Sequence, residues 1–530
     1  MDVILLNGGI TEASLIQRYI GPYKIAHWCR KHGYDTRVLD FVEICTEAML
    51  YNMIKKFITP KTLVIGVSTT FMSVNSFIWS NGDKHLMPEA VYKALKKIKE
   101  EYNGIKIILG GYMSEKYPGY GIFDATIMSY YEATEEIFVE YLNHLRTGSE
   151  PPLGQIQFPL FKSKPRMVYS SARNKIYNIE YDDFKFTKND YILPGEPLPL
   201  DISRGCIFAC RFCQFPHIGK KKLDYIRGME YIEAELLHNY ENFGTTSYYV
   251  LDDTFNDTEQ KLSEFNKMVQ RLPFKLTYSA YIRADLVHRF PNTVDLLRES
   301  GLTGAYHGIE SFHPEASKLV GKAWSGKEGK EFLPKLYHDL WGKDVAMHLN
   351  FIIGLTGESK DSIKSTMKWF LENDMPASRF SPLGLFGPDP SARRTIQSEF
   401  DKNAEKYGFN IISDPGDNGR VDWKNDLWES DMAMSWSERV NNNLQPYQKY
   451  AAWGMQGLRW YGFSPQMLAN HYIRQLPNQL IKRRSADLKR IYAEYVLTDK
   501  VDLSTATDPL VNINFDFLNL VRSSRSFKRT

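Results

Sequence analysis

The chain has 530 residues, of which 43% are hydrophobic and 24% charged, as in an ordinary globular protein. Its net charge of +3 gives no overall attraction to nucleic acid, and no apolar run approaches the roughly 20 residues that span a bilayer. The length predicts about three or four domains. The first residues, Met1–Asn7, carry no basic segment, so we expect no secretion signal and a cytoplasmic location.

Residues 1–150 alternate between short apolar runs and helical patterns. This alternation predicts a doubly wound, flavodoxin-like parallel sheet. The predicted strands are Val3–Leu6, Thr36–Phe41, Leu63–Ser68, Lys106–Gly110 and Ala125–Met128, and the predicted helices are Ser14–His32, Ile44–Phe57, Pro88–Tyr102 and Thr134–Leu145. Small residues follow three of the strands, at Asn7–Gly9, Ser68–Thr70 and Gly110–Gly111. Ligands bind at these strand ends in such sheets, and small residues would let a flat ligand approach the backbone.

Residues 151–198 are rich in proline and have weak periodicity. We interpret them as a linker that wraps the next domain.

A cysteine cluster occupies Ser203–Phe215, where Cys206, Cys210 and Cys213 are spaced C-x3-C-x2-C. Three of the five cysteines thus fall within eight residues, which indicates a metal or iron–sulfur site. Three thiolates would leave one iron of a four-iron cluster open to a substrate or cofactor. His217 offers an alternative, a Cys3His zinc site.

The neighbours of the cysteines suit a shielded site. Gly205 would let the backbone turn tightly, and Phe208 and Phe212 would keep water from the sulfurs. Disulfides are not expected in a reducing cytoplasm. Cys29 and Cys45 have no metal-like spacing and are predicted to be buried packing residues.

Residues 199–390 repeat a strand–helix unit six times. The predicted strands are Leu198–Ile202, Ser247–Leu251, Leu276–Ile282, Ala305–Ile309, Ala346–Ile353 and Arg379–Leu385. The helices between them are predicted at Tyr225–Asn242, Thr258–Arg271, Thr293–Ser300, Lys327–Trp341 and Lys360–Asn373. Six such units predict an open, partial barrel, with functional residues at the carboxyl ends of the strands.

The cysteine spacing, the aromatic Phe212 before the third cysteine and the six units that follow resemble radical S-adenosylmethionine (radical SAM) enzymes. The resemblance runs through about 150 residues in the right order. It implies a [4Fe–4S] cluster on Cys206, Cys210 and Cys213, with SAM chelated to the open iron. It also implies a partial (βα)6 barrel.

The resemblance implies roles at the other strand ends as well. Asp252 and Asp253 would lie near the SAM amino group, and Arg283 would hold the SAM carboxylate. Glu310 would bind the ribose hydroxyls or the amino group, and Ile352–Gly354 would pass beside the adenine. Two structural alternatives stay open.

Arg283 and Glu310 could instead form a buried ion pair between strands. Asp253 could be a helix N-cap, although Thr258 is better placed for that. No residue is singled out as a catalytic acid or base.

A flavodoxin-like domain upstream of such a barrel resembles the cobalamin-binding domain of cobalamin-dependent radical SAM enzymes. It implies cobalamin as a further cofactor. Many such domains carry a cobalt-ligating histidine after the first strand, but Gly8–Glu12 has none, and His27 and His32 sit in a helical pattern. Relatives without this histidine still bind cobalamin, while the alternative is a domain that has lost the cofactor.

Residues 391–530 show mainly helical signals and dense aromatics. Helices are predicted at Ser398–Tyr407, Ser435–Leu444, Pro446–Tyr461, Pro465–Gln475 and Ala486–Val496. The aromatics are interpreted as core, in a region that closes the substrate cleft in enzymes of this architecture.

The sequence as a whole predicts a radical SAM enzyme that methylates an unactivated carbon with the help of cobalamin. The alternatives are a radical SAM enzyme that performs cyclisation or rearrangement, and a non-enzymatic metal-stabilised binding protein. Expected partners are a small-molecule or peptide substrate and an electron donor such as flavodoxin or ferredoxin. No membrane partner is expected, and nucleic acid is not favoured.

Overall fold

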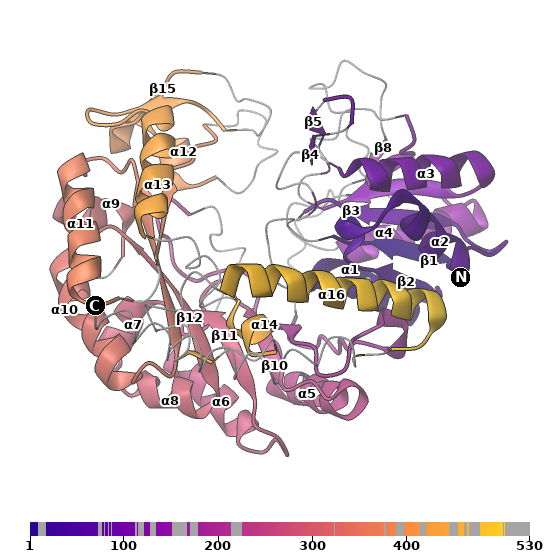
Figure 1. Ribbon diagram of the computed structural model, residues 1–530, viewed down its shortest axis with the longest axis horizontal. Coiled ribbons are helices and arrows are strands. Elements are labelled where there is room, and N and C mark those ends of the chain that lie inside the picture. Colours follow the sequence, from indigo (N-terminus) through magenta and orange to yellow (C-terminus); the bar gives the residue numbers. More distant parts are fainter. Residues whose placement is uncertain are drawn as a thin grey trace, which may run out of the picture.

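The computed structural model describes residues 1–8, 17–70, 72, 77–78, 80–82, 84–85, 87–111, 114, 121–127, 134–150, 167–169, 179–213, 225–322, 324–375, 378–387, 397–413, 420–444, 454–460, 464–465, 477–501 and 503. Two α/β units lie side by side in it (Figure 1). None of the helices in these ranges combines the length and the apolar character that crossing a membrane requires.

The first unit is built on a six-stranded sheet in the order β2-β1-β3-β6-β7-β8. All of its neighbouring strands pair in parallel. The strands are β1 (Val3–Leu6), β2 (Thr36–Leu39), β3 (Val64–Ser68), β6 (Lys106–Gly110), β7 (Ala125–Ile127) and β8 (Met167–Tyr169). The five predicted strands are confirmed, and β8 adds a sixth from within the predicted linker. Strand order reverses between β1 and β3, which is the position where ligands bind in such sheets.

Helices cover both faces of this sheet because side chains alternate along each strand. In β1, Ile4 and Leu6 join the buried cluster of α2 (Glu47–Phe57) and α3 (Glu89–Glu101). Val3 and Leu5 join that of α1 (Ile20–Lys31) and α4 (Thr134–Thr147). A short antiparallel pair, β4 (Phe77–Ile78) with β5 (Lys84–His85), lies outside the sheet. The predicted buried cysteines, Cys29 and Cys45, are confirmed at 0% and 6% exposure.

The second unit is a six-stranded parallel sheet in the order β14-β13-β12-β11-β10-β9. Its strands follow one another in the chain: β9 (Leu198–Asp201), β10 (Ser247–Leu251), β11 (Thr277–Tyr281), β12 (Leu302–Glu310), β13 (Ala346–Ile353) and β14 (Ser378–Pro382). β9 and β14 are the two ends and do not pair with each other within the described residues. The predicted open barrel is therefore confirmed.

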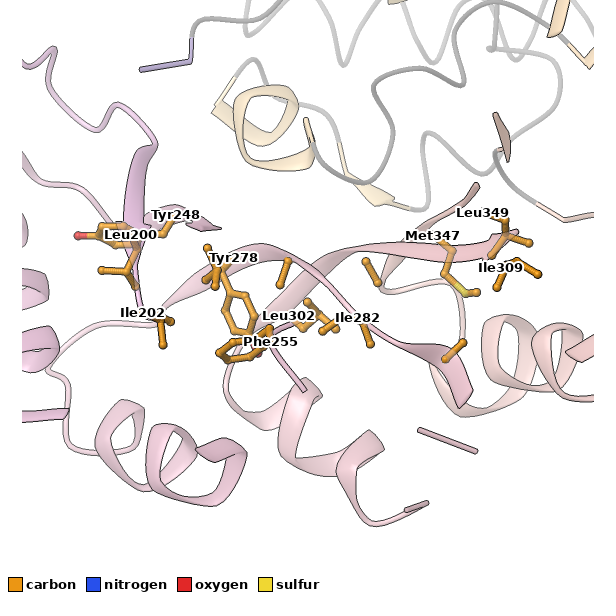
Figure 2. Close-up of a cluster of buried hydrophobic side chains, with 14 of the residues drawn as sticks. Leu200, Ile202, Tyr248, Phe255, Tyr278, Ile282, Leu302, Ile309, Met347 and Leu349 are labelled. Carbon is orange, nitrogen blue, oxygen red and sulfur yellow. The ribbon is translucent and has the colours of Figure 1, made fainter. Parts of the chain in front are cut away.

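Helices follow the strands β9 to β13 and cover the outer face of the barrel (Figure 1). They are α5 (Met229–Phe243), α6 (Glu259–Val269), α7 (Ala284–Arg289), α8 (Thr293–Glu299), α9 (Pro314–Val320), α10 (Gly326–Lys335) and α11 (Lys360–Glu372). The α10 helix continues into one π-helical turn, Leu336–Leu340. Figure 2 shows the apolar side chains beneath these helices, among them Leu200, Tyr278, Ile282 and Leu349.

The outer edge of β14 is covered by α13 (Ser430–Leu444). The backbone N–H of Phe380 donates to Asn441 Oδ1 at 2.9 Å, and Asn441 Nδ2 donates to the Phe380 carbonyl at 2.8 Å. One side chain thus occupies both backbone groups that a further strand would use. Trp423 and Trp428 are each 1% exposed, which confirms these two aromatics as core.

The remaining C-terminal helices, α14 (Met455–Trp460) and α16 (Pro477–Thr498), pack against different units. Helix α14 packs against β10, β11 and β12. Its buried Gln456 Nε2 donates to Thr303 Oγ1 at 2.8 Å and its Oε1 accepts from Thr277 Oγ1 at 3.2 Å. Since Thr277 and Thr303 lie where β11 and β12 begin, α14 lies against the amino ends of these strands. Helix α16 instead packs on α2 of the first unit.

The other C-terminal predictions have mixed outcomes. The helix predicted at Ser398–Tyr407 is broken into α12 (Glu399–Lys402) and a 3-10 turn, Glu405–Tyr407. Of Pro446–Tyr461 only α14 is described, and Pro465–Gln475 lies outside the described residues except at its first position.

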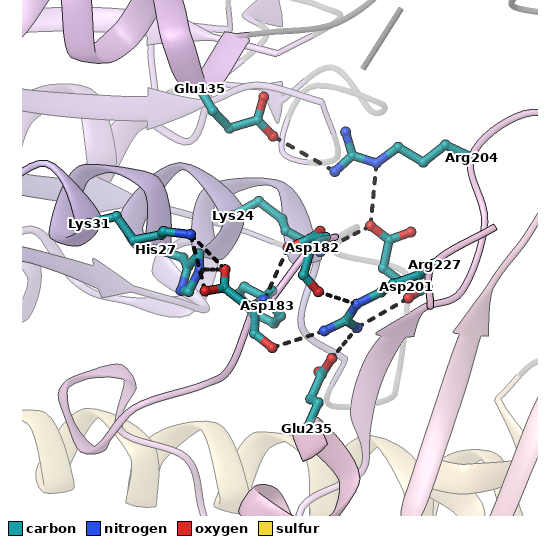
Figure 3. Close-up of polar contacts among 11 residues, drawn as sticks. Lys24, His27, Lys31, Glu135, Asp182, Asp183, Asp201, Arg204, Arg227 and Glu235 are labelled. Carbon is teal, nitrogen blue, oxygen red and sulfur yellow. Dashed lines mark hydrogen bonds and ion pairs between the residues drawn. The ribbon is translucent and has the colours of Figure 1, made fainter. Parts of the chain in front are cut away.

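A buried ion-pair network joins the two units (Figure 3). Lys24 of α1 pairs with Asp182 of the connecting segment and, at 3.2 Å, with Asp201 at the end of β9. Arg204 Nε donates to the same Asp201 carboxylate at 3.3 Å. The Nη2 of Arg204 lies 3.8 Å from Glu135 Oε1 on α4. The segment that leads into the cysteine cluster is thereby fixed against the first unit.

Candidate active site

The cysteine loop begins where β9 ends. Gly205 has a φ of +81°, the left-handed conformation that glycine adopts most easily, and the chain turns there into Cys206. Arg211 fastens the loop on both sides. Its backbone N–H donates to the Val320 carbonyl at 3.1 Å, and its own carbonyl accepts from Phe400 N–H at 3.0 Å.

The three cysteines of this loop form no disulfide, and all are half-buried. The backbone N–H of Cys213 donates to the Cys210 carbonyl at 3.0 Å, which forms a tight turn between them. Phe212, predicted as part of the cover, is half-buried and packs against the hydrophobic core.

Cys206 faces the end of the next strand. Its Sγ lies 3.4 Å from Thr254 Oγ1 and accepts from the Phe208 N–H at 3.4 Å. Burial raises the pKa of the Cys206 thiol, and the hydrogen bonds with Thr254 and Phe208 lower it. Donors aimed at a sulfur are groups that would stabilise a thiolate ligand.

Cys210 faces a cation. Arg283 Nη1 donates to Cys210 Sγ at 3.8 Å, and the guanidinium carbon lies 4.0 Å from the centre of the Phe208 ring. Asp285 accepts from the other two nitrogens, from Nε at 3.0 Å and from Nη2 at 2.5 Å. Arg283 is thus part of the cysteine site, and its bidentate edge is already used by Asp285.

The spacing of the sulfurs separates the two kinds of metal site. Tetrahedral zinc, with Zn–S bonds near 2.3 Å, would bring its sulfurs to about 3.8 Å from one another. Within the described residues only His27, Asp182 and Asp183 offer three ligand atoms within 4.8 Å of one another. At least two of the three cysteine sulfurs therefore lie farther apart than the ligands of one tetrahedral zinc ion. His217, the fourth ligand of the zinc alternative, lies outside the described residues.

Asp252 and Asp253, at the end of β10, differ in their surroundings. Asp252 is buried, accepts from the Thr254 N–H at 2.9 Å and pairs with the fully buried Lys261 at 2.9 Å. It thus fixes the turn that presents Thr254 to Cys206. Asp253 is exposed and is the carboxylate of this pair that a ligand can reach. The helix N-cap is Thr258, as the sequence favoured.

Glu310 ends β12 with a φ of +69°, which is rare for a residue other than glycine. Its carboxylate accepts from Lys322 Nζ at 2.8 Å. A Cβ at Gly308 would lie 2.3 Å from Glu310 Oε1 and 2.9 Å from Lys322 Nζ, so the pair depends on glycine at this position. Arg283 and Glu310 do not pair with each other; each has a partner that the sequence did not reveal.

Ile352 and Gly354, predicted to lie beside the adenine, are covered to different extents. Ile352 is 7% exposed, and its register neighbour is Ser381 on β14. Gly354 has a φ of +104°, its carbonyl accepts from Asn425 Nδ2 at 3.0 Å, and a Cβ there would lie 2.5 Å from Trp423. The C-terminal region thus packs directly on Gly354.

The inner face of the barrel carries a row of rings that the sequence analysis did not single out. Tyr281, Tyr306 and His348 are register neighbours on β11, β12 and β13. The Tyr281 and Tyr306 ring centres are 5.0 Å apart, and Tyr306 stacks on His348 at 4.6 Å. The alternation of apolar and polar residues along these strands was the available signal.

The carboxyl edge of the first sheet is the expected cobalamin site. A Cβ at Gly8 would lie 3.2 Å from Glu43 Oε2 and 3.3 Å from Met72 Cε. Lys489 of α16 donates to Glu43 Oε1 at 2.9 Å, and both side chains are buried. The C-terminal helix thus reaches this edge of the sheet.

The neighbouring strand end, after β6, shows a matching arrangement. Gly111 has a φ of +92°, and a Cβ there would lie 2.4 Å from Thr70 Oγ1. Ser114 Oγ is buried and has no hydrogen-bond partner within the described residues. An orphaned hydroxyl beside closely packed glycines fits a polar ligand with amide groups, such as a corrin. Of the segment Gly8–Glu12, only Gly8 is described.

Comparison with known proteins shows which family profile, relatives and solved structures this chain is similar to. The profile of the radical SAM superfamily matches residues 200–370. An uncharacterised methyltransferase of Pyrococcus horikoshii is 23% identical over 402 residues, which cover 72% of this chain and 80% of that protein. A bacteriochlorophyllide d C-12(1)-methyltransferase of Chlorobaculum tepidum is 22% identical over 44% of this chain and 51% of that protein.

A solved structure is similar across nearly the whole chain. It is the cobalamin-dependent S-adenosylmethionine radical enzyme OxsB with aqua-cobalamin bound. The match covers 98% of this chain and 75% of that one, with a TM-score of 0.57 and 13% sequence identity. At this identity the likeness shows the fold, and it includes both α/β units.

Proposed function

We propose that this chain, a radical SAM enzyme whose radical SAM domain spans residues 200–370, holds a [4Fe–4S] cluster on Cys206, Cys210 and Cys213. When bound and reduced, the cluster would pass one electron to the sulfonium of SAM, which breaks into methionine and a 5′-deoxyadenosyl radical. The observation that carries this proposal is the loop of three half-buried thiols at the carboxyl end of β9.

The residues around the loop would orient the cluster and SAM. The Phe208 N–H is positioned to donate to Cys206, which Thr254 Oγ1 also contacts, and Arg283 is positioned to donate to Cys210. Asp253 would accept from the SAM ammonium, since it is the exposed carboxylate at the end of β10. Glu310, held by Lys322, would accept from the ribose hydroxyls.

We further propose that the first unit binds cobalamin and that the reaction is transfer of a methyl group to an unactivated carbon. Bound cobalamin would carry that methyl group. Two observations support this: relatives named as methyltransferases, and a fold match over 98% of the chain to a cobalamin-dependent enzyme. Gly8, Gly111 and the unpaired Ser114 hydroxyl would receive the cofactor at the carboxyl edge of the sheet.

The substrate would be a small molecule or a peptide, and the electron would come from a protein donor such as flavodoxin or ferredoxin. A second function, cyclisation or rearrangement without methyl transfer, is favoured by one observation. A Cβ at Gly8 would lie 3.2 Å from Glu43 Oε2, and one at Gly111 would lie 2.4 Å from Thr70 Oγ1, so these side chains already occupy space beside both glycines.

The test uses full-length protein purified without oxygen and reconstituted with iron and sulfide. Its visible spectrum reports cluster and corrinoid together. After reduction, SAM should yield methionine and 5′-deoxyadenosine in equal amounts. Protein that binds one zinc and never cleaves SAM would refute the enzyme, whereas SAM cleavage by protein that retains no cobalamin would favour the second function.

A further inference from the structure

The inner face of the barrel carries an arginine on its last strand. Phe380 of β14 stacks on Phe351 at 4.8 Å, within the core beneath the outer helices. Because side chains alternate along a strand, Arg379 and Ser381 point to the opposite, inner face. Arg379 lies in register with Asn350 of β13, and Ser381 Oγ donates to Asn350 Oδ1 at 3.3 Å.

Arg379 has no protein partner in the part of the chain that the structure describes: its guanidinium makes no hydrogen bond or ion pair there, and the residue is exposed. The neighbouring charges differ in this respect. Glu310 forms an ion pair with Lys322, and Arg283 forms one with Asp285. Arg379 is therefore a cation on the inner face whose guanidinium can pair with an anionic ligand.

The row of rings lies beside this cation. Tyr281 is 38% exposed, so part of its ring is accessible. Burial raises the pKa of Tyr306 above its ordinary range, Tyr281 and Glu310 add to the rise, and the nearby Arg379 charge opposes it. An aromatic surface thus adjoins the Arg379 guanidinium, for which the described residues provide no partner.

We propose that Arg379 is a substrate-binding residue that holds an oxyanion of the substrate, a carboxylate or a phosphate, while a planar part of the substrate lies on Tyr281 and Tyr306. A guanidinium presents parallel donors that match either oxyanion. The inference rests on the proposed function only in naming the bound molecule as substrate.

Binding of small probes to the full-length protein tests this assignment. Indole-3-acetate and phenyl phosphate each join a ring to an oxyanion, and indole-3-acetamide is the neutral counterpart of the first. Calorimetric titration should show that at least one anionic probe binds about tenfold or more tightly than the amide. Which of the two anions binds tighter distinguishes carboxylate from phosphate. Equal affinity for both anions and the amide would overturn the proposal.

Three variants locate the effect. Arg379→Gln should weaken binding of the preferred anion about 10- to 100-fold, and Arg379→Lys should recover part of it because the charge remains without the planar donors. Arg439→Gln, an exposed arginine on α13, is the matched control and should bind as the unmodified protein does. Unchanged affinity in Arg379→Gln, or an equal loss in Arg439→Gln, would overturn the assignment.

The outcome is separable from that of the proposed function. SAM cleavage is measured on the unmodified reconstituted protein without any probe. If cleavage fails while the anion still depends on Arg379, the proposed reaction is wrong and the anion site stands. If SAM cleavage proceeds and anion binding does not depend on Arg379, the proposed reaction stands and the anion site is wrong.

Discussion

Arg283 Nη1 donates to Cys210 Sγ at 3.8 Å, so a fixed positive charge lies against one of the three thiols of the cysteine loop. A reduced cluster carries one more negative charge than an oxidised one. A cation at this distance therefore stabilises the reduced form.

We expect Arg283→Met to make the reduction potential of the reconstituted cluster more negative. A charge-assisted hydrogen bond contributes about 1.5–3 kcal/mol, which for one electron corresponds to roughly 65–130 mV. A redox titration followed by electron paramagnetic resonance measures the shift. Arg283→Lys keeps the charge and should shift the potential less, and an unchanged potential in Arg283→Met would contradict this role.

Cys210→Ala should abolish both cluster binding and SAM cleavage, because two thiolates cannot replace three ligands. Iron content and the visible spectrum after reconstitution measure the first effect. Cys29→Ala is the control: Cys29 is fully buried, belongs to the first unit, and should leave the iron content unchanged. Full iron content in Cys210→Ala would show that the ligand set is wrong.

His307 predicts a dependence of stability on pH. Burial lowers its pKa from 6.5 to about 4; Nδ1 bonds to the Ile282 carbonyl at 2.7 Å, while Nε2 has no described partner. The neutral form is thus favoured on folding, and its contribution is lost as the pH falls from 6.5 towards 4. Between pH 7 and pH 5 we expect a loss of about 2 kcal/mol.

Denaturant unfolding at the two pH values measures this loss. His307→Gln keeps a donor for the Ile282 carbonyl but does not titrate, so its stability should fall by about 2 kcal/mol less over the same range. Identical pH profiles for the two proteins would argue against a neutral, buried His307.

Lys489 tests how α16 is held on the first unit. Lys489→Met removes the ion pair from the buried Glu43 carboxylate and should destabilise the protein by about 3–5 kcal/mol. The control is Arg490→Met, one residue along α16, whose ion pair with Glu494 is exposed and should contribute less than about 0.5 kcal/mol. Hydrogen exchange in α2 and α16 should rise in the first variant alone.

Gly354→Ala should be strongly destabilising. The new Cβ would lie 2.5 Å from Trp423, and the φ of +104° is unfavourable for alanine, so we expect a cost of about 2 kcal/mol or more. Gly104→Ala, where a Cβ meets nothing within 4 Å, is the control. Thermal unfolding compares them, and equal melting temperatures would contradict the packing of Trp423 on Gly354.

Most of the barrel could be predicted because each of its strands is a short apolar run beside a helical pattern. Local signals also identified Thr258 as an N-cap and the cysteine loop as a site. Partners brought together only by folding could not be predicted, since nothing near Glu310 in the sequence points to Lys322, and nothing near Asp252 to Lys261. The strand β8 was missed for a related reason, because its proline-rich surroundings favour a loop.

The site was predicted unevenly for the same physical reason. The cysteines are neighbours in sequence, so their spacing alone predicts a metal or iron–sulfur site. Arg379 becomes notable only once Phe380 is known to face outward and no described partner neutralises the guanidinium. The placement of α16 on the first unit likewise follows from contacts across more than four hundred residues, such as Lys489 with Glu43.

The bond between Asn441 and both backbone groups of Phe380 has a consequence for behaviour at high concentration. An open barrel has two ends at which a stray chain could extend the sheet and seed aggregates. At the β14 end the Asn441 side chain occupies the backbone N–H and carbonyl of Phe380, the groups with which an added strand would pair. The barrel can therefore stay open while its β14 edge is protected from pairing with another copy of the chain.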